Sequence, residues 1–201
     1  MKEIESRIYQ SGYSLIAGVD EAGRGPLAGP VCAAAVIFPK GTVIEGINDS
    51  KKLSEKKREA LFDVIKKEAV AFAVEFASPE EIDKINIKQA TARAMHSAID
   101  ALSVKPDYII IDGNDNLPYD IPYEYVVKGD TLSQTIAAAS ILAKVSRDRL
   151  MKELDKSYPQ YDFKKHKGYG TKAHIEAIRR CGVSDIHRKS FMTAKVLGEE
   201  R

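Results

Sequence analysis

An apolar run that ends in two adjacent acids constrains the fold of this chain more than any other feature. Residues 15–19 are apolar or glycine, as in a buried strand, and Asp20 and Glu21 follow directly. Two neighbouring carboxylates repel each other unless a cation lies between them. Hard divalent cations such as Mg²⁺ prefer carboxylate oxygen. The sequence therefore predicts a strand whose carboxyl end holds metal ligands.

Two further acids follow apolar segments. Asp112 ends the run 108–111, and Asp130 follows the strand-like segment 123–128. Asp112 could instead start a turn before Gly113, and Asp130 could be the N-cap of the next helix. Together, four acids at three strand ends of one predicted sheet indicate a two-metal site for phosphodiester chemistry.

Length and composition favour a single domain over residues 1–201. The chain is 44% hydrophobic and 30% charged, enough for a substantial core under a charged surface. No segment approaches the roughly 18 consecutive apolar residues of a membrane span, and the start has no signal-peptide core. Cys32 and Cys181 are too few for a disulfide framework, so we expect both to be reduced packing residues. These features favour a cytoplasmic protein.

Charge is distributed unevenly along the chain. Residues 144–201 carry 15 basic and 8 acidic residues, whereas residues 1–143 carry 16 and 21, and the whole chain has a net charge of +2. A basic C-terminal third beside an acid-bearing portion fits a metal centre flanked by a polyanion-binding surface. A solvated helix face would give the same pattern. A non-catalytic nucleic-acid-binding module is the main alternative, although binding alone gives no reason to place four acids near a phosphate backbone.

Hydrophobic periodicity and capping signals predict a mixed α/β fold. Strands are expected at 15–20, 31–38, 70–77, 107–112 and 123–128. Helices are expected at 54–68, from 78, at 86–102, 131–158 and 171–181. The first half of the 131–158 helix is rich in alanine, which favours burial against the sheet. Its second half is predicted to be cationic through Lys144, Arg147, Arg149 and Lys152.

The loop Gly23-Arg24-Gly25 is a candidate ligand contact. Glycine adopts positive φ at no cost and lets the backbone approach a ligand closely, although a simple tight turn would use the same residues. The loop does not match a dinucleotide-binding fingerprint, because Ala28 stands where the third glycine is required. That mismatch argues against a nucleotide-binding α/β protein.

A second glycine-bounded loop presents Tyr169 between lysines. Residues 165–171 read Lys-His-Lys-Gly-Tyr-Gly-Thr, an arrangement suited to stacking of the ring on a sugar or base. A buried core tyrosine is the alternative. His166, His174 and His187 lack the spacing of metal ligands, and we interpret them as structural or phosphate-proximal.

Taken together, these segments resemble bacterial ribonuclease HII, a type 2 ribonuclease H. The similarity covers roughly residues 15–191, in blocks at 19–31, 49–53, 112–113, 128–130, 137–148, 166–171 and 187–188. The sister ribonuclease HIII typically carries an added N-terminal domain and lacks the arginine of the Gly-Arg-Gly loop. A type HII enzyme is therefore expected, with a type HIII enzyme as the alternative.

The resemblance implies a ribonuclease H-like fold: a five-stranded mixed sheet flanked by helices, with a helical C-terminal extension at about 171–201. It also implies a monomeric endonuclease that uses Mg²⁺ or Mn²⁺. Its substrates would be RNA–DNA hybrid duplexes and DNA with embedded ribonucleotides, cut to leave 3′-hydroxyl and 5′-phosphate ends.

The resemblance also assigns residues to roles. By position, the metal-binding acids are Asp20, Glu21, Asp112 and Asp130. The residues that sense the ribonucleotide are Gly23, Arg24, Gly25 and Tyr169, and the phosphate contacts are Lys51, Ser140 and Lys144.

Overall fold

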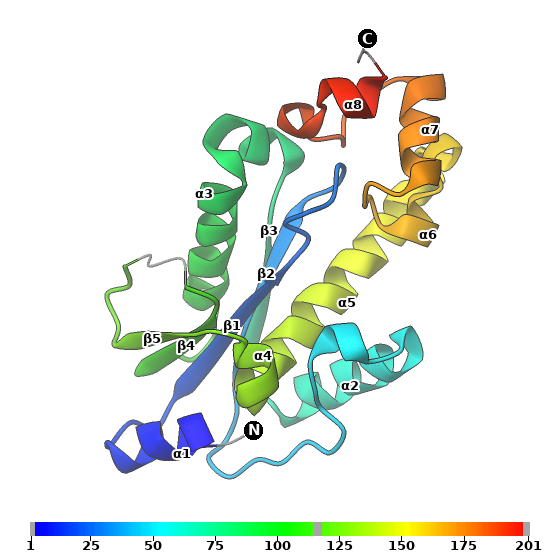
Figure 1. Cartoon of the computed structure of the whole chain (residues 1–201). Helices are drawn as coiled ribbons and strands as arrows, with labels where there is room; N and C mark the ends of the chain where they lie inside the picture. Colours follow the sequence, from blue (N-terminus) through cyan, green and yellow to red (C-terminus); the bar gives the residue numbers. More distant parts are fainter. Residues whose placement is uncertain (1–2, 115–117, 199–201) are drawn as a thin grey trace.

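A five-stranded mixed sheet lies at the centre of the computed structural model, which describes residues 3–114 and 118–198 (Figure 1). The strands stand in the order β3-β2-β1-β4-β5. Strand β2 is antiparallel to β1 and β3, and β4 is parallel to β1 and β5. Their bounds are β1 Ile16–Ala22, β2 Val31–Ile37, β3 Ala71–Ala77, β4 Tyr108–Asp112 and β5 Tyr123–Val126. The predicted strands and the mixed sheet are confirmed.

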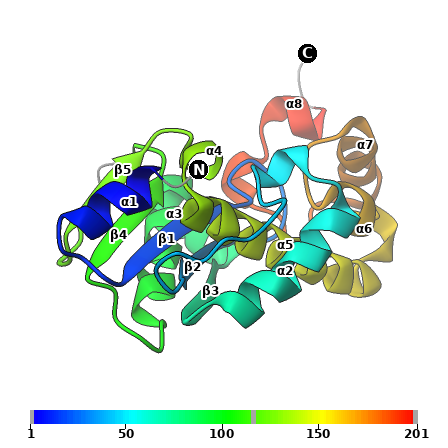
Figure 2. The same cartoon turned by 90° about the horizontal axis from the view of Figure 1, so that it is seen from below.

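Helices cover both faces of the sheet (Figures 1 and 2). On one face, α3 (Pro79–Asp100) packs on alternate residues of β1 and β2. On the other, α5 (Gln134–Ser157) and α2 (Glu55–Glu68) pack on the intervening residues. Since both faces are covered, all seven residues of β2 are buried, which explains its continuous apolar sequence.

Short helices complete the chain. Helix α1 (Glu3–Gln10), which the sequence did not lead us to expect, packs Ile8 near Ile16 and Ile136. The others are α4 (Gly129–Leu132), α6 (Phe163–His166), α7 (Lys172–Cys181) and α8 (Ala194–Leu197), with 3₁₀ turns at Ser50–Lys52, Pro159–Tyr161 and Lys189–Phe191. Helices α6 to α8 share a small core with the C-terminal half of α5, which confirms the helical C-terminal extension.

The prediction that one helix begins at Thr131 is wrong. The chain forms α4, then an extended residue, Ser133, and α5 begins only at Gln134. The Ser133 hydroxyl accepts the N–H of Ile136 at 3.1 Å, so serine caps α5. Asp130 lies inside α4 and is not the cap. No glycine or proline marks this break, and a side-chain cap at serine is a weaker signal in a sequence.

The structure also decides the burial of two residues. Arg147, counted among the side chains that make the second half of the helix cationic, is 1% exposed, and its spacing from Ala143 places it on the inner face of α5. Cys32 is buried as expected, but Cys181 is exposed, because the core around α7 ends at Ile178, one turn earlier. Both thiols are free. No helix within residues 3–114 and 118–198 has the length and apolar character needed to cross a membrane.

Helix α3 changes direction at Asn86, where the sequence predicted a new helix start. Asn86 has φ of 66° and ψ of 163°, a region populated almost solely by glycine. Its Oδ1 accepts the N–H of Gln89 at 3.1 Å and caps the second segment. A side-chain cap therefore offsets a strained backbone.

We predict opposite outcomes for two substitutions at Asn86. Asn86→Ala keeps the strain and loses the cap, so it should lower the free energy of unfolding by about 1–2 kcal/mol. Asn86→Gly relieves the strain and, as an N-cap, costs only a few tenths of a kcal/mol, so it should be nearly neutral. Urea unfolding of both variants measures the difference. Equal losses would show that only the cap matters.

Candidate active site

Parallel pairing of β1 and β4 brings the first three acids to one edge of the sheet. The last paired residues are Val19 and Ile111, so Asp20 and Asp112 follow on adjacent strands at the same level. Glu21 is the next residue of β1. The acids that the sequence placed at separate strand ends therefore lie together.

Asp130 reaches this edge through a backbone contact. The Oδ1 of Asp112 accepts the N–H of Gly129 at 2.6 Å, which fixes the start of α4 against the end of β4. A Cβ on Gly129 would lie 2.5 Å from the Cδ1 of Ile136 and 3.2 Å from the same Asp112 oxygen. Only glycine permits this approach, and it delivers Asp130 to the site.

The carboxylates of this cluster repel one another. Burial raises the pKa of Asp20 well above its usual value, and the charges of Glu21 and Asp112 raise it further. Burial also raises the pKa of Asp130, again with Asp112 adding to the effect. Lys51 places its Nζ 3.9 Å from the Asp130 carboxylate, but its side chain is 81% exposed. The cluster thus carries an excess of negative charge.

The donor chemistry of this cluster fits a hard divalent cation. Asp20, Glu21, Asp112 and Asp130 supply only carboxylate oxygens, the ligands that Mg²⁺ and Mn²⁺ take. Within the described residues, no three His, Cys, Asp or Glu side chains already form a ligand set. Like charges stay apart when nothing neutralises them. A bound cation would have to draw these carboxylates together.

Ser140 lies behind the acids and not on the open surface. It is 3% exposed on α5, and its hydroxyl is 2.9 Å from that of Ser50. It also hydrogen-bonds the Asp20 carboxylate and thereby opposes the rise in the pKa of that group. In this structure Ser140 orients Asp20, so the predicted phosphate contact would need a substrate to reach this depth.

Asp49, in the segment 49–53 that contributes to the family resemblance, belongs to the same neighbourhood. Its Oδ1 accepts the N–H of Lys51 at 2.9 Å and caps the 3₁₀ turn that carries Lys51. It also raises the pKa of Asp130, by its charge and by a hydrogen bond. An aspartate two residues before a lysine, at a turn start, was the available signal.

The two predicted ribonucleotide sensors are neighbours. A Cβ on Gly25 would lie 4.0 Å from the Cε1 of Tyr169, and Arg24 places Nη1 3.6 Å from Glu21. The Tyr169 side chain belongs to a residue that is 42% exposed, which decides against a buried core tyrosine. Arg24 and Gly25 of the Gly-Arg-Gly loop and Tyr169 therefore form one exposed surface beside the acids, and Gly23 is buried beneath it.

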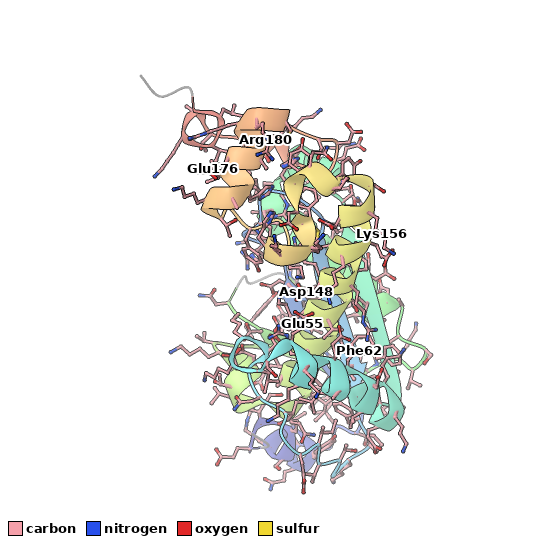
Figure 3. All side chains as sticks on the ribbon, turned by 90° about the vertical axis from the view of Figure 1, so that its right-hand side faces the viewer. Glu55, Phe62, Asp148, Lys156, Glu176 and Arg180 are labelled. Atoms are coloured by element: carbon pink, nitrogen blue, oxygen red, sulfur yellow. The ribbon has the colours of Figure 1, made fainter. Side chains whose placement is uncertain are left out.

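Lys144 borders this surface. Its Nζ lies 5.9 Å from the centre of the Tyr169 ring and 2.7 Å from an Asp148 carboxylate oxygen. Figure 3 shows Asp148 on α5, between α2 and α6. Lys144 thus reaches the face that carries Tyr169.

Three histidines pack together under the Tyr169 loop. His166 and His174 stack with ring centres 4.4 Å apart, and His174 Nε2 lies 3.1 Å from His187 Nε2. His187 Nδ1 accepts a hydrogen bond from the N–H of Ser184, while His174 Nδ1–H donates a hydrogen bond to the carbonyl of Tyr169. His187 Nε2 is then the donor to His174, and both rings are neutral. The packing and hydrogen bonds of these rings favour a structural role.

Comparisons with known proteins place the chain in a family. The sequence profile of the family Ribonuclease HII matches residues 17–194. Ribonuclease HII of Desulfitobacterium hafniense is 57% identical over 93% of this chain and 72% of that protein. The crystal structure of ribonuclease H2 from Pyrococcus horikoshii superposes with a TM-score of 0.78 at 28% identity, over 92% of this chain and 98% of that one. A Bst-RNase HIII in complex with Mn²⁺ shares the fold, with a TM-score of 0.68 at 18% identity over 95% of this chain and 71% of that one.

Asp20→Asn should stabilise the protein in metal-free buffer. The raised pKa means that ionised Asp20 is unfavourable in the folded state. The gain in free energy of unfolding should be about 1 kcal/mol or more near pH 8 and should vanish as the pH falls and Asp20 takes up a proton. Urea unfolding at several pH values tests this, with the exposed Asp63→Asn as a control that should show no gain. A loss of stability in Asp20→Asn would contradict the repulsion.

The histidine cluster should make stability fall in mild acid. Burial lowers the pKa of both His174 and His187 to about 4 from the usual 6.5. Between pH 6.5 and 4 the unfolded chain therefore binds more protons than the folded protein. The free energy of unfolding should keep its full value above pH 6.5 and fall towards pH 4, by on the order of 2 kcal/mol per histidine. Comparing the pH slopes of wild type and His187→Gln separates this effect from that of Asp20, which has the opposite sign. Identical slopes would contradict the prediction.

Proposed function

Because the chain belongs to the ribonuclease HII family and is thus a ribonuclease H, a hydrolase of RNA in RNA–DNA hybrids, we propose that it also cuts DNA duplexes 5′ of an embedded ribonucleotide. The products would carry 3′-hydroxyl and 5′-phosphate ends. The observation that carries this proposal is the position of the acid cluster directly beside the surface formed by the Gly-Arg-Gly loop and Tyr169.

The acids would hold the divalent cations. Asp20, Glu21, Asp112 and Asp130 are the proposed ligands, and Ser140 keeps the Asp20 carboxylate oriented. When bound, Mg²⁺ or Mn²⁺ supplies an activated water and neutralises the leaving 3′-oxygen. The Mn²⁺ complex of the similarly folded Bst-RNase HIII supports a divalent metal. Such a site requires no imidazole as a general base, which is consistent with a structural role for the buried neutral histidines.

Basic side chains around the acids would hold the nucleic-acid backbone. Lys51 is mostly exposed and lies next to Asp130, and Lys144 lies next to Tyr169. Each can contact a phosphate on its own side of the cut bond. Lys144 must exchange its Asp148 partner for that phosphate, since the two side chains are paired in this structure.

Recognition of a single ribonucleotide requires a contact to its 2′-hydroxyl, the group that distinguishes RNA from DNA. Backbone groups at the exposed end of the Gly-Arg-Gly loop can provide that contact, because Gly25 is exposed and carries no side chain that would shield them. The exposed ring of Tyr169, adjacent to Gly25, can pack on the neighbouring sugar. The loop would then bind the 2′-hydroxyl of the ribonucleotide, while the ring would contact the sugar next to it.

The decisive experiment uses one DNA duplex with a single ribonucleotide and a second duplex of RNA–DNA hybrid. We expect wild type to cut both with Mg²⁺ or Mn²⁺, and to cut the first on the 5′ side of the ribonucleotide. Asp112→Asn should reduce single-turnover cleavage of both by at least about 10³-fold, since it removes an anionic ligand from a two-metal site. Asp63→Asn is the matched control and should cut normally.

Two results would count against the proposal. Cleavage of the hybrid without incision at the single ribonucleotide would remove its specific part. Binding of both duplexes without cleavage under either metal would favour the alternative of a nucleic-acid-binding module.

A further inference from the structure

Two buried arginines, Arg147 and Arg188, lie beneath the proposed substrate surface. Arg188 is 0% exposed and Arg147 is 1% exposed. Neither forms an ion pair with any described residue, and their hydrogen bonds go to backbone carbonyl oxygens. Burying a charge without a counter-charge is costly. Each guanidinium binds three backbone carbonyl oxygens and so fixes the chain segments that carry them. This ordering of the backbone would offset the cost of burying the charge.

Arg188 holds the Gly-Arg-Gly loop from below. Its Nη2 donates to the carbonyl of Gly23 at 2.6 Å, its Nη1 to that of Arg24 at 2.8 Å, and its Nε to that of Gly29 at 2.9 Å. In a trans peptide the C=O and the following N–H point in opposite directions. The N–H groups of Arg24 and Gly25 are therefore turned away from the buried guanidinium.

The same contacts change the chemistry of those N–H groups. A cation bound to a carbonyl oxygen polarises the whole amide, so its N–H becomes a stronger donor. Burial and the nearby charge of Arg147 lower the pKa of Arg188 to about 9, so it stays charged at neutral pH. The outward amides of Arg24 and Gly25 are thus prepared to donate to an oxygen of a ligand.

Arg147 joins this loop to the Tyr169 segment. Its Nε donates to the carbonyl of Pro30 and its Nη2 to that of Ala28, while its Nη1 donates to Lys167, two residues before Tyr169. Its guanidinium carbon lies 5.8 Å from the centre of the Tyr169 ring.

Gly23 shows how closely Arg147 also packs on the loop. A Cβ at Gly23, which has φ of +95°, would lie 2.0 Å from the Arg147 Nε. One side chain therefore contacts the loop on one side and the Tyr169 segment on the other. A movement of Arg147 would change the spacing between the two.

We propose that Arg188 and Arg147 are positioning residues for ribose recognition: Arg188 orients and polarises the Gly-Arg-Gly amides, and Arg147 sets their spacing from Tyr169. The inference deepens the proposed function and rests on it. Lysine cannot replace either side chain, because a single ammonium lacks the planar fork that reaches three carbonyls at fixed angles. The charge alone is therefore insufficient.

The test measures binding to two duplexes that differ by one hydroxyl. One carries a single ribonucleotide and the other is all DNA with the same sequence, and affinities are measured by fluorescence anisotropy in Ca²⁺, with gels to confirm that the strands stay intact. The readout is the ratio of the two dissociation constants. We expect Arg188→Lys to lower this ratio about tenfold, equivalent to about 1.4 kcal/mol, while affinity for the all-DNA duplex stays within about twofold.

The control separates positioning from general stability. Ile65→Ala removes packing in the core between α2 and the sheet, far along the chain from both loops, and should lower the melting temperature with the wild-type ratio intact. Arg147→Lys should lower the ratio as Arg188→Lys does, and it serves as the second test if Arg188→Lys does not fold. Tyr169→Ala should lower the ratio of dissociation constants less when it is added to Arg147→Lys than when it is made in the wild-type protein.

A wild-type ratio in a folded arginine variant would overturn the inference. Equal losses of affinity for both duplexes would also overturn it, since they would assign the arginines a merely structural role. The inference would also be overturned if the unaltered protein bound the two duplexes equally well, with a ratio of dissociation constants near one. The proposed function would then still be decided by the cleavage assay. Failure of that assay, in contrast, would remove both.

Discussion

The close approach of α5 to β1 is the contact on which the rest of the structure depends. A Cβ at Gly18 would lie 2.5 Å from the carbonyl carbon of Thr135, so only glycine lets the helix settle on this strand. Once seated, α5 runs the length of the molecule (Figure 1). It places Ser140 behind Asp20, Lys144 and Arg147 beside Tyr169, and its C-terminal half under the helical extension.

Charge is arranged along this helix in two unbalanced groups. Beside its N-terminal half, the acid cluster carries more negative charge than its surroundings neutralise, and burial makes this costlier for Asp20. Further along, two buried guanidiniums donate hydrogen bonds to backbone carbonyl oxygens and form no ion pair with a described residue. Both arrangements cost stability in isolation. Each arrangement would favour binding of a ligand of opposite charge or polarity. The acids would bind cations, and the outward amides would bind the electronegative oxygens of a nucleic acid.

Membership of the ribonuclease HII family and the contacts of this chain give two different kinds of information. The family indicates the chemistry, hydrolysis of RNA paired with DNA. The contacts indicate how a backbone loop can be held rigidly enough to distinguish one hydroxyl. A loop of glycines is intrinsically free to move, so its order must come from elsewhere, and here it comes from arginines that are distant in sequence.

The sequence by itself determined the five strands, most helix starts and the grouping of four acids at one edge of the sheet, because apolar periodicity, capping residues and paired carboxylates are local signals. Ser54, Ser78 and Thr171, the first residues of three expected helices, are the N-caps of α2, α3 and α7. Local signals failed where long-range contacts decide. The break at Ser133, the burial of Arg147, the exposure of Cys181 and the withdrawal of Ser140 behind Asp20 all follow from what packs against each residue. Arg188 and Gly23 are 165 residues apart, and only the tertiary structure could bring that guanidinium to those carbonyls.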